Sequence, residues 1–169
     1  MKRGYATAGC LILLLLLTPF GFAATGQTDE KNAPEKLIKA ASFLEQKPLD
    51  KDAKKVRRWA IEWLIVTDKV SVNACSLLIR GIDKKYKYGS ELFGQYTIGM
   101  GAYKLANPDK AQDEDLAQQA GIESALTSYE ATVAEEPKAR NAFMDELLAK
   151  RSQGALAAYV KENNCKGKN

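Results

Sequence analysis

Apolar residues recur at intervals of three and four positions from Pro34 to Cys165, which is the spacing of one face of an α-helix. An alternation with a period of two, which would indicate half-buried strands, is missing from this stretch. The pattern predicts about seven helices, which begin near Pro34, Lys51, Ser71, Ser90, Asp109, Pro137 and Gly154. We therefore expect an all-α single domain whose helices pack as antiparallel hairpins in a bundle.

The second predicted helix, residues 51–67, has the clearest apolar stripe. Its members are Val56, Trp59, Ala60, Trp63 and Val66, and the stripe is widened by Ile61, Leu64 and Ile65. The first half of the helix is basic instead, with Lys54, Lys55, Arg57 and Arg58. We interpret this basic run as a solvated face, and the alternative is a contact with anionic lipid or an acidic polymer.

The third and fourth predicted helices cover residues 71–84 and 90–105. The fourth contains three glycines, Gly94, Gly99 and Gly101. Because each glycine lowers helix stability by about 1 kcal/mol relative to alanine, these positions predict the close approach of a neighbouring helix. In the fifth helix the apolar face changes after Gly121, which predicts either a bend or a helix that contacts two partners.

A repeat-like stack of hairpins is the alternative architecture. The spacing of the second half of a tetratricopeptide repeat is matched by Ala125, Tyr129, Thr132 and Pro137. The first half of that motif would need apolar anchors at three positions that are polar here, Asp109, Gln112 and Asp113. Half of one motif leaves the bundle as the favoured arrangement.

The first residues have the three parts of a secretory signal. Lys2 and Arg3 form a basic start, residues 10–22 an apolar run, and the exit is made of small residues. We predict cleavage after Ala23, with cleavage after Ala24 as the alternative and an uncleaved membrane anchor as a further one. The chain then divides into a signal peptide (1–23), a flexible leader (24–33), a helical domain (34–165) and a disordered tail (166–169). We expect an exported protein, periplasmic or extracellular, that meets a membrane only through an uncleaved signal.

Charge and composition exclude several classes of chemistry. Lys and Arg total 25 against 21 Asp and Glu, and loss of Lys2 and Arg3 with the signal lowers the formal charge from +4 to +2. Such a balance gives no electrostatic case for binding nucleic acid. The chain has no histidine, which excludes Ser-His-Asp and Cys-His nucleophile systems and histidine zinc sites. We expect no cofactor and no metal ion.

Two cysteines, Cys75 and Cys165, remain after removal of the signal, which contains Cys10. In an oxidising compartment such a pair predicts a disulfide that ties the last helix to the middle of the chain. The alternative is one buried thiol and one thiol in the C-terminal tail.

The connection before the fourth helix is basic and aromatic, with Lys85, Tyr86, Lys87 and Tyr88. Phenol rings in a loop can stack on sugars or peptides, and the lysines can meet an anionic group. We therefore select these four residues as the candidate binding site. The alternative is that the rings belong to the core.

Two stretches of the chain resemble a loose group of uncharacterised exported bacterial proteins. The first runs from Pro48 through Arg58-Trp59-Ala60 and Trp63 to Thr67-Asp68-Lys69-Val70, and the second is Tyr86-Lys87-Tyr88-Gly89-Ser90-Glu91-Leu92 followed by Gln95-Tyr96. The similarity extends over most of the mature chain. It implies export and a helical fold, and it assigns no activity and no site residues.

These observations favour a non-enzymatic exported protein that binds a partner, a protein or a glycan, in the cell envelope or periplasm. The alternative is a carboxylate-based hydrolase acting on cell-wall polymers, which needs two carboxylates about 5–10 Å apart in a cleft. Its candidate residues are Glu91, Asp113, Glu114, Asp115, Glu123, Glu130, Glu135 and Glu136. Nearly all of them lie at polar helical positions or in first turns, so no catalytic residue is assigned.

Overall fold

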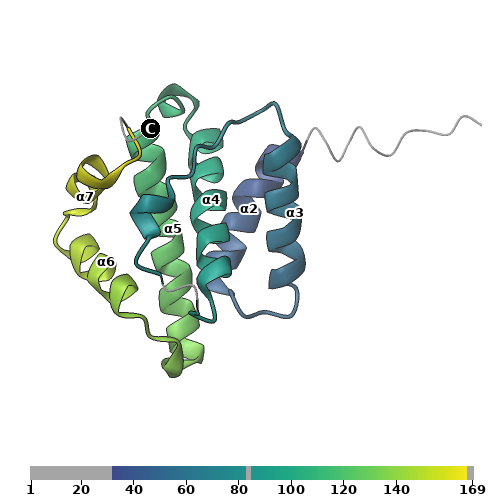
Figure 1. Ribbon diagram of the computed structural model, residues 1–169. Helices are drawn as coiled ribbons and strands as arrows, with labels where there is room; N and C mark the ends of the chain where they lie inside the picture. The colour runs from purple at the N-terminus through teal and green to yellow at the C-terminus, as the bar shows by residue number, and fades with distance from the viewer. Residues whose placement is uncertain (1–31, 83–84, 167–169) are drawn as a thin grey trace, which may run out of the picture.

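The computed structural model describes residues 32–82 and 85–166, and it confirms the all-α fold (Figure 1). The described residues form six α-helices, three short 3-10 helices and no strand. The α-helices are α2 (Ala33–Gln46), α3 (Ala53–Val66), α4 (Gly89–Ala106), α5 (Glu114–Glu135), α6 (Ala142–Ser152) and α7 (Leu156–Asn163). The 3-10 helices are η1 (Ser76–Ile79), η2 (Pro108–Lys110) and η3 (Pro137–Ala139). The predicted signal peptide and nearly all of the leader lie outside the described residues.

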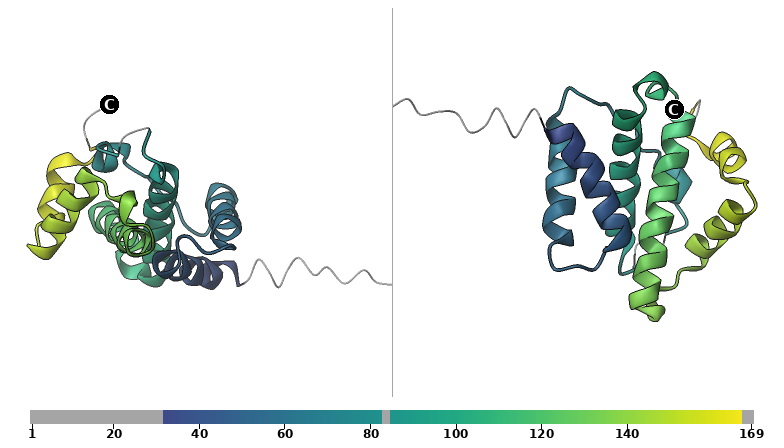
Figure 2. Two further views of the ribbon diagram at one scale, coloured as in Figure 1. Left: turned by 90° about the horizontal axis from the view of Figure 1, so that it is seen from below. Right: turned by 180° about the vertical axis from the view of Figure 1, so that it is seen from behind.

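Helices α4 and α5 lie side by side at the centre of the molecule (Figure 1). The hairpin of α2 and α3 lies on one side of this pair, and α6 and α7 lie on the other, as the views from below and behind confirm (Figure 2). Helix α3 contacts α2 and α4, so it forms the outer edge of the bundle on its side.

Helix α4 separates two hydrophobic cores. Leu92, Tyr96 and Met100 belong to the core shared with α5, α6, α7 and η1, whereas Ile98 and Ala102 belong to the core shared with α2 and α3. An apolar helix with no polar face is stable only when both of its sides are covered. The composition of α4 therefore determines its place in the middle of the bundle.

The glycines of α4 and α5 allow these two helices to approach closely, as expected. A Cβ atom at Gly99 would lie 2.4 Å from Ser124 Cβ, and one at Gly121 would lie 2.6 Å from the backbone oxygen of Tyr96. The change of apolar face after Gly121 reflects two sets of partners, because α5 is one helix of 22 residues that packs against α2 and α4 and also against α6 and α7.

The prediction of a helix over residues 71–84 is wrong, because only η1 forms within the described part of this stretch, residues 71–82. Side chains of α4 bond to the backbone of the non-helical residues that precede η1. The backbone N–H of Cys75 donates to Tyr96 Oη at 3.1 Å, and Lys104 Nζ donates to the carbonyl oxygen of Ser71 at 2.9 Å. These bonds satisfy backbone groups that a helix would otherwise have paired internally.

Several predicted helix starts are also displaced. Ser90 lies inside the first turn of α4, which begins one residue earlier. The proline turns at residues 108–110 and 137–139 are 3-10 helices, so α5 and α6 begin only after them. Their caps are Asp113, whose side chain accepts from two backbone N–H groups at 3.1 Å, and Asn141, whose Oδ1 accepts from Met144 N at 3.1 Å.

Candidate functional site

The predicted loop site is built into the junction between α4 and α5. Tyr88 is only 7% exposed, and its hydroxyl donates to the Glu136 carboxylate. Lys87 Nζ lies 3.0 Å from both oxygens of the same carboxylate. The hydrogen bond from Tyr88, followed by that from Lys87, holds the pKa of Glu136 below its usual value. These two residues therefore join the start of α4 to the end of α5.

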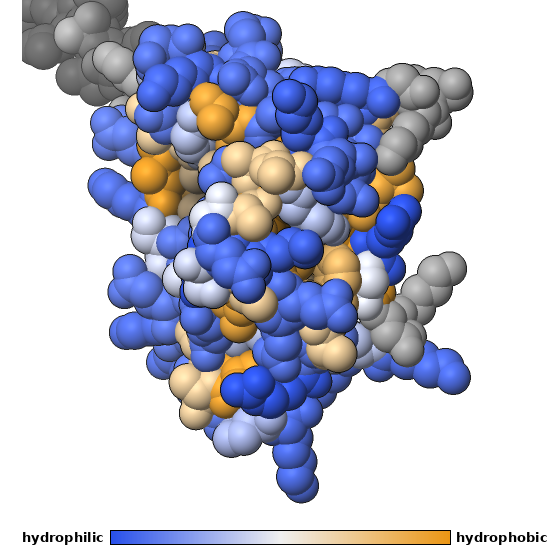
Figure 3. Space-filling view, turned by 90° about the vertical axis from the view of Figure 1, so that its left-hand side faces the viewer, coloured by the Kyte–Doolittle hydropathy of each residue, from blue (hydrophilic) through white to orange (hydrophobic). Residues whose placement is uncertain are grey.

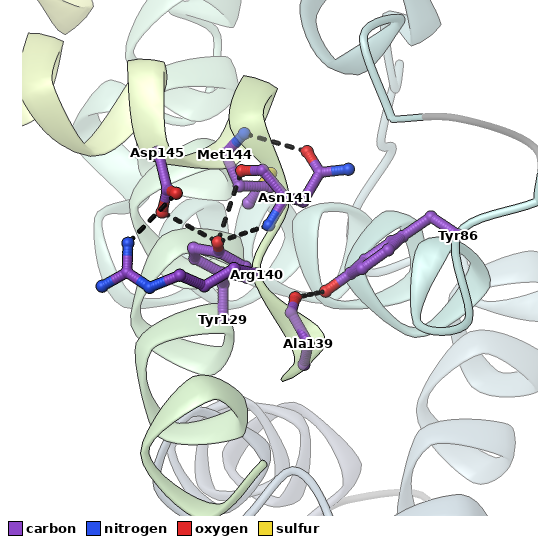
Figure 4. Close-up of polar contacts among 7 residues, drawn as sticks. All are labelled: Tyr86, Tyr129, Ala139, Arg140, Asn141, Met144 and Asp145. Atoms are coloured by element: carbon purple, nitrogen blue, oxygen red, sulfur yellow. Dashed lines mark hydrogen bonds and ion pairs between the residues drawn. The ribbon is translucent and has the colours of Figure 1, made fainter. Parts of the chain in front are cut away.

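Tyr86 is half-buried, and its hydroxyl donates to the carbonyl oxygen of Ala139 at 2.6 Å (Figure 4). Burial, more than the neighbouring charges, raises the pKa of Tyr86 to about 12. Tyr86 and Lys87 also line a hollow of about 720 Å³, together with Ser76, Ile79, Arg80, Ile82, Gly89, Ser90 and Phe93. Lys85 is exposed, and neither Lys85 nor Tyr88 lines this hollow. Binding at this loop stays a prediction.

Tyr129 is the centre of a polar cluster at the connection between α5 and α6 (Figure 4). The backbone N–H of Asn141 donates to its hydroxyl at 2.8 Å, and the hydroxyl donates to Asp145 Oδ1 at 2.8 Å. Asp145 also forms an ion pair with Arg140 at 3.1 Å. Because every one of these polar groups has a partner, the cluster fixes the connection rather than offering a reactive centre.

Helix α3 is more exposed to solvent than its apolar composition predicts. Its second half, from Trp59 to Val66, is apolar at every position except Glu62, yet only Ala53 and Ala60 are buried in the whole helix. Ile65 and Val66 are 76% and 79% exposed. A helix that is apolar around most of its circumference is normally covered on most sides.

The two tryptophans of the chain lie in the seam between α2 and α3. Trp59 and Trp63 are half-buried and stack with ring centroids 6.4 Å apart and ring planes 19° apart. Lys36 Nζ, from α2, lies 4.3 Å from the centroid of Trp59, within cation–π distance. The seam between α2 and α3 is thus lined by aromatic rings and has a positive charge at its edge.

Two hollows follow this seam. One, of about 750 Å³, is lined by Ala33, Lys36, Trp59, Trp63, Val66, Thr67, Asp68 and Lys69. The other, of about 580 Å³, is lined by Lys36, Lys39, Ala40, Phe43, Asp52, Lys55, Val56 and Trp59. They share Lys36 and Trp59, so they form one continuous surface, which we call the α2–α3 groove and define by these two sets of residues.

The opposite side of the molecule, over α6 and α7, has a different character. Hydrophilic residues predominate there, and apolar residues appear as separate spots (Figure 3). This side therefore provides control positions for tests of the α2–α3 groove.

The sequence pattern placed Trp59 and Trp63 on a helical stripe without showing that this stripe would stay partly open. The signal available in the sequence was the width of the apolar surface, since Ile61, Leu64 and Ile65 extend it beyond one face. An apolar surface that is too wide for a single neighbouring helix to cover indicates either a central helix or an interface.

A smaller hollow, of about 330 Å³, is lined by two glutamates, Glu45 and Glu123. Ser124 Oγ donates to Glu45 Oε1 at 2.6 Å and accepts from Gln95 Nε2 at 2.8 Å. Burial is the main cause that raises the pKa of Glu123 above its usual value. Glu123 was among the candidate carboxylates, whereas Glu45 was missed because only the packing of α2 on α5 brings it here.

The structure brings Cys75 and Cys165 to disulfide distance, with the sulfur atoms 2.06 Å and the Cα atoms 5.7 Å apart. Residues beside Cys165 bond to the first turn of α5. Lys166 Nζ lies 2.9 Å from Asp115 Oδ2, and this hydrogen bond is the main cause that lowers the pKa of Asp115. Of the predicted disordered tail, Lys166 is thus in contact with the domain, and residues 167–169 lie outside the described part.

Within residues 32–82 and 85–166, no group of three or more cysteine, aspartate or glutamate side chains is arranged to hold a metal ion. None of the described helices has both the length and the apolar character needed to cross a membrane. Comparison of the chain with protein families, with curated proteins and with solved structures finds no match.

Proposed function

We propose that this protein is an exported, non-enzymatic binding protein whose docking surface is the α2–α3 groove. The observation that carries the proposal is the outer position of α3, a helix with an apolar surface that no described element covers on its outer side. Exposed apolar surface of this kind, rimmed by charge, is typical of interaction sites.

The composition of the groove supports a role in binding. Tryptophan is among the residues that contribute most to protein interfaces, because it combines a large contact area with little conformational freedom. Trp59 and Trp63 lie beside the exposed side chain of Val66, so apolar anchors and an open surface occur together. The loop of Tyr86 and Lys87 is a second contact region on the hollow that it lines.

The compartment is proposed from the signal-like first residues and supported by the cysteine pair at disulfide distance, which suits an oxidising environment. We expect the protein purified from the cell envelope fraction to begin at Ala24, which intact-mass spectrometry would show. A full-length protein that remains in the cytosolic fraction would contradict this part of the proposal.

Site-specific photo-cross-linking in the cells that produce the protein tests the docking surface. A photoreactive amino acid at Val66, which lines the groove and is 79% exposed, should give a discrete higher-mass adduct. The same amino acid at Ala157, exposed on α7, is the matched control and should give none. Absence of an adduct at Val66, or equal adducts at both positions, would refute binding through this groove.

A second candidate function is favoured by the hollow of Glu45 and Glu123. A half-buried carboxyl with a raised pKa beside a second carboxylate is an arrangement that a carboxylate-based hydrolase can use. Zymography on peptidoglycan tests it: clearing by the wild-type protein that is lost in Glu123→Gln would favour the hydrolase. No clearing by the folded wild-type protein would exclude action on that polymer.

A further inference from the structure

We propose that the partner segment bound by the α2–α3 groove is an acidic amphipathic helix of another protein. This inference rests on the proposed function and specifies the chemistry of the partner. It follows from the shape of the groove, the charges on its rim and the positions of the two tryptophans.

The shape of the groove fits a helix. Helices α2 and α3 each contain 14 residues, and they run antiparallel as a hairpin. At 1.5 Å per residue the seam between them is about 21 Å long, which matches three to four turns of a third helix. The two hollows lie in series along this seam, so they can receive apolar side chains that recur at i, i+3 or i+4, and i+7 of a docked helix.

The positive charge along the edge of the groove favours an acidic partner. In the hollow that contains Phe43, three lysines, Lys36, Lys39 and Lys55, face a single carboxylate, Asp52. A helix with glutamate or aspartate beside its apolar face would meet these cations, whereas a basic helix would be repelled.

The same charges argue against a second copy of this chain. A two-fold symmetric contact through the groove would bring Lys36, Lys39 and Lys55 of each copy toward the same surface of the other. The positions of the tryptophans favour a docked helix over a lipid bilayer. The outermost residues in the first half of α3 are charged, and the tryptophans lie between the two helices, where an inserted side chain can reach them.

Both tryptophans of the chain line the groove, so intrinsic fluorescence reports on its occupancy. The probe is a tryptophan-free synthetic peptide of about 18 residues with leucine at helical spacing and glutamate on its other faces. Titration of the mature protein at low salt should give a saturable blue shift that weakens as salt is added. The same peptide with lysine in place of glutamate is the matched control and should give no saturable shift.

Charge variants at exposed lysines test the inference directly and leave the hydrophobic cores unchanged. The triple variant Lys36→Gln, Lys39→Gln, Lys55→Gln should weaken binding of the acidic peptide about tenfold. The control triple variant, at exposed lysines outside the groove, is Lys110→Gln, Lys138→Gln, Lys161→Gln and should bind within about twofold of wild type. Circular dichroism would verify that both variants are folded.

The outcomes separate this inference from the proposed function. A cross-linked adduct at Val66 combined with no response to the acidic peptide would overturn the acidic-helix partner while the docking surface stands. A shift that occurs with phosphatidylglycerol vesicles and not with the peptide would assign the groove to a lipid surface instead. Equal responses to the acidic and the basic peptide would also refute the inference, because charge would then play no part.

Discussion

The hydroxyl of Tyr96 on α4 accepts a hydrogen bond of 3.1 Å from the backbone N–H of Cys75. Tyr96 is fully buried, and its hydroxyl also donates to the Gln118 side chain on α5. Cys75 is therefore held by α4 as well as by its contact with Cys165.

We expect reduction of the cysteine pair to destabilise the protein without unfolding it at room temperature. Opening a loop of about 90 residues removes a constraint on the unfolded chain that is worth about 2–5 kcal/mol. Urea denaturation with and without reductant measures this difference. The Cys75→Ser, Cys165→Ser double variant should show the lower stability and no response to reductant. A wild-type stability that is insensitive to reductant would contradict the presence of the bridge.

Gly121→Ala should destabilise the protein by about 1–3 kcal/mol, because the added methyl group meets the Tyr96 carbonyl oxygen and Met100 at about 2.6 Å. Gly94→Ala in α4 is the control. Its new methyl group would meet the flexible side chain of Arg57 at 3.2 Å, so the change should stay below about 1 kcal/mol. Chemical denaturation of both variants makes the comparison. Equal effects would show that close helix approach is not the reason for Gly121.

Tyr129→Phe should cost about 1–3 kcal/mol of stability, because the backbone N–H of Asn141 loses its acceptor and Asp145 loses a donor. Tyr103→Phe is the matched control, since the Tyr103 hydroxyl makes no hydrogen bond to any residue in the described ranges. Thermal denaturation followed by circular dichroism gives both values. If Tyr129→Phe leaves the stability unchanged, water must replace the hydroxyl at the start of α6.

Glu123 should make the protein less stable as the pH rises. Burial raises the pKa of Glu123 in the folded protein above the unfolded value near 4.3. The contribution of Glu123 to stability is therefore fully present below about pH 4.3 and is lost as the pH rises through the folded-state pKa. Glu123→Gln should therefore gain stability relative to wild type between pH 4 and pH 7. Urea denaturation across this range tests the sign, with Glu62→Gln at an exposed position of α3 as control. A gain that is equal at every pH would refute the titration of Glu123 as its cause.

The tyrosine loop shows how a local pattern can identify a segment and miss its contacts. The basic and aromatic residues from Lys85 to Tyr88 suggested an open surface. Tyr88 is buried because Glu136, at the far end of α5, supplies the partner for its hydroxyl. That partner is 48 positions away, and no periodicity in the chain indicates such a pairing.

The sequence by itself determined the helical character of the chain, the close approach of a neighbouring helix to the glycine-rich α4 and the identity of the paired cysteines. These features depend on local periodicity, on the small size of glycine and on the cysteine count. Only the tertiary structure decided that residues 71–75 lie outside any helix, because side chains of α4 and α5 bond to their backbone. It also decided that Trp59 and Trp63 line an open groove, because periodicity shows that a helix has an apolar face and cannot show how many neighbours will cover it.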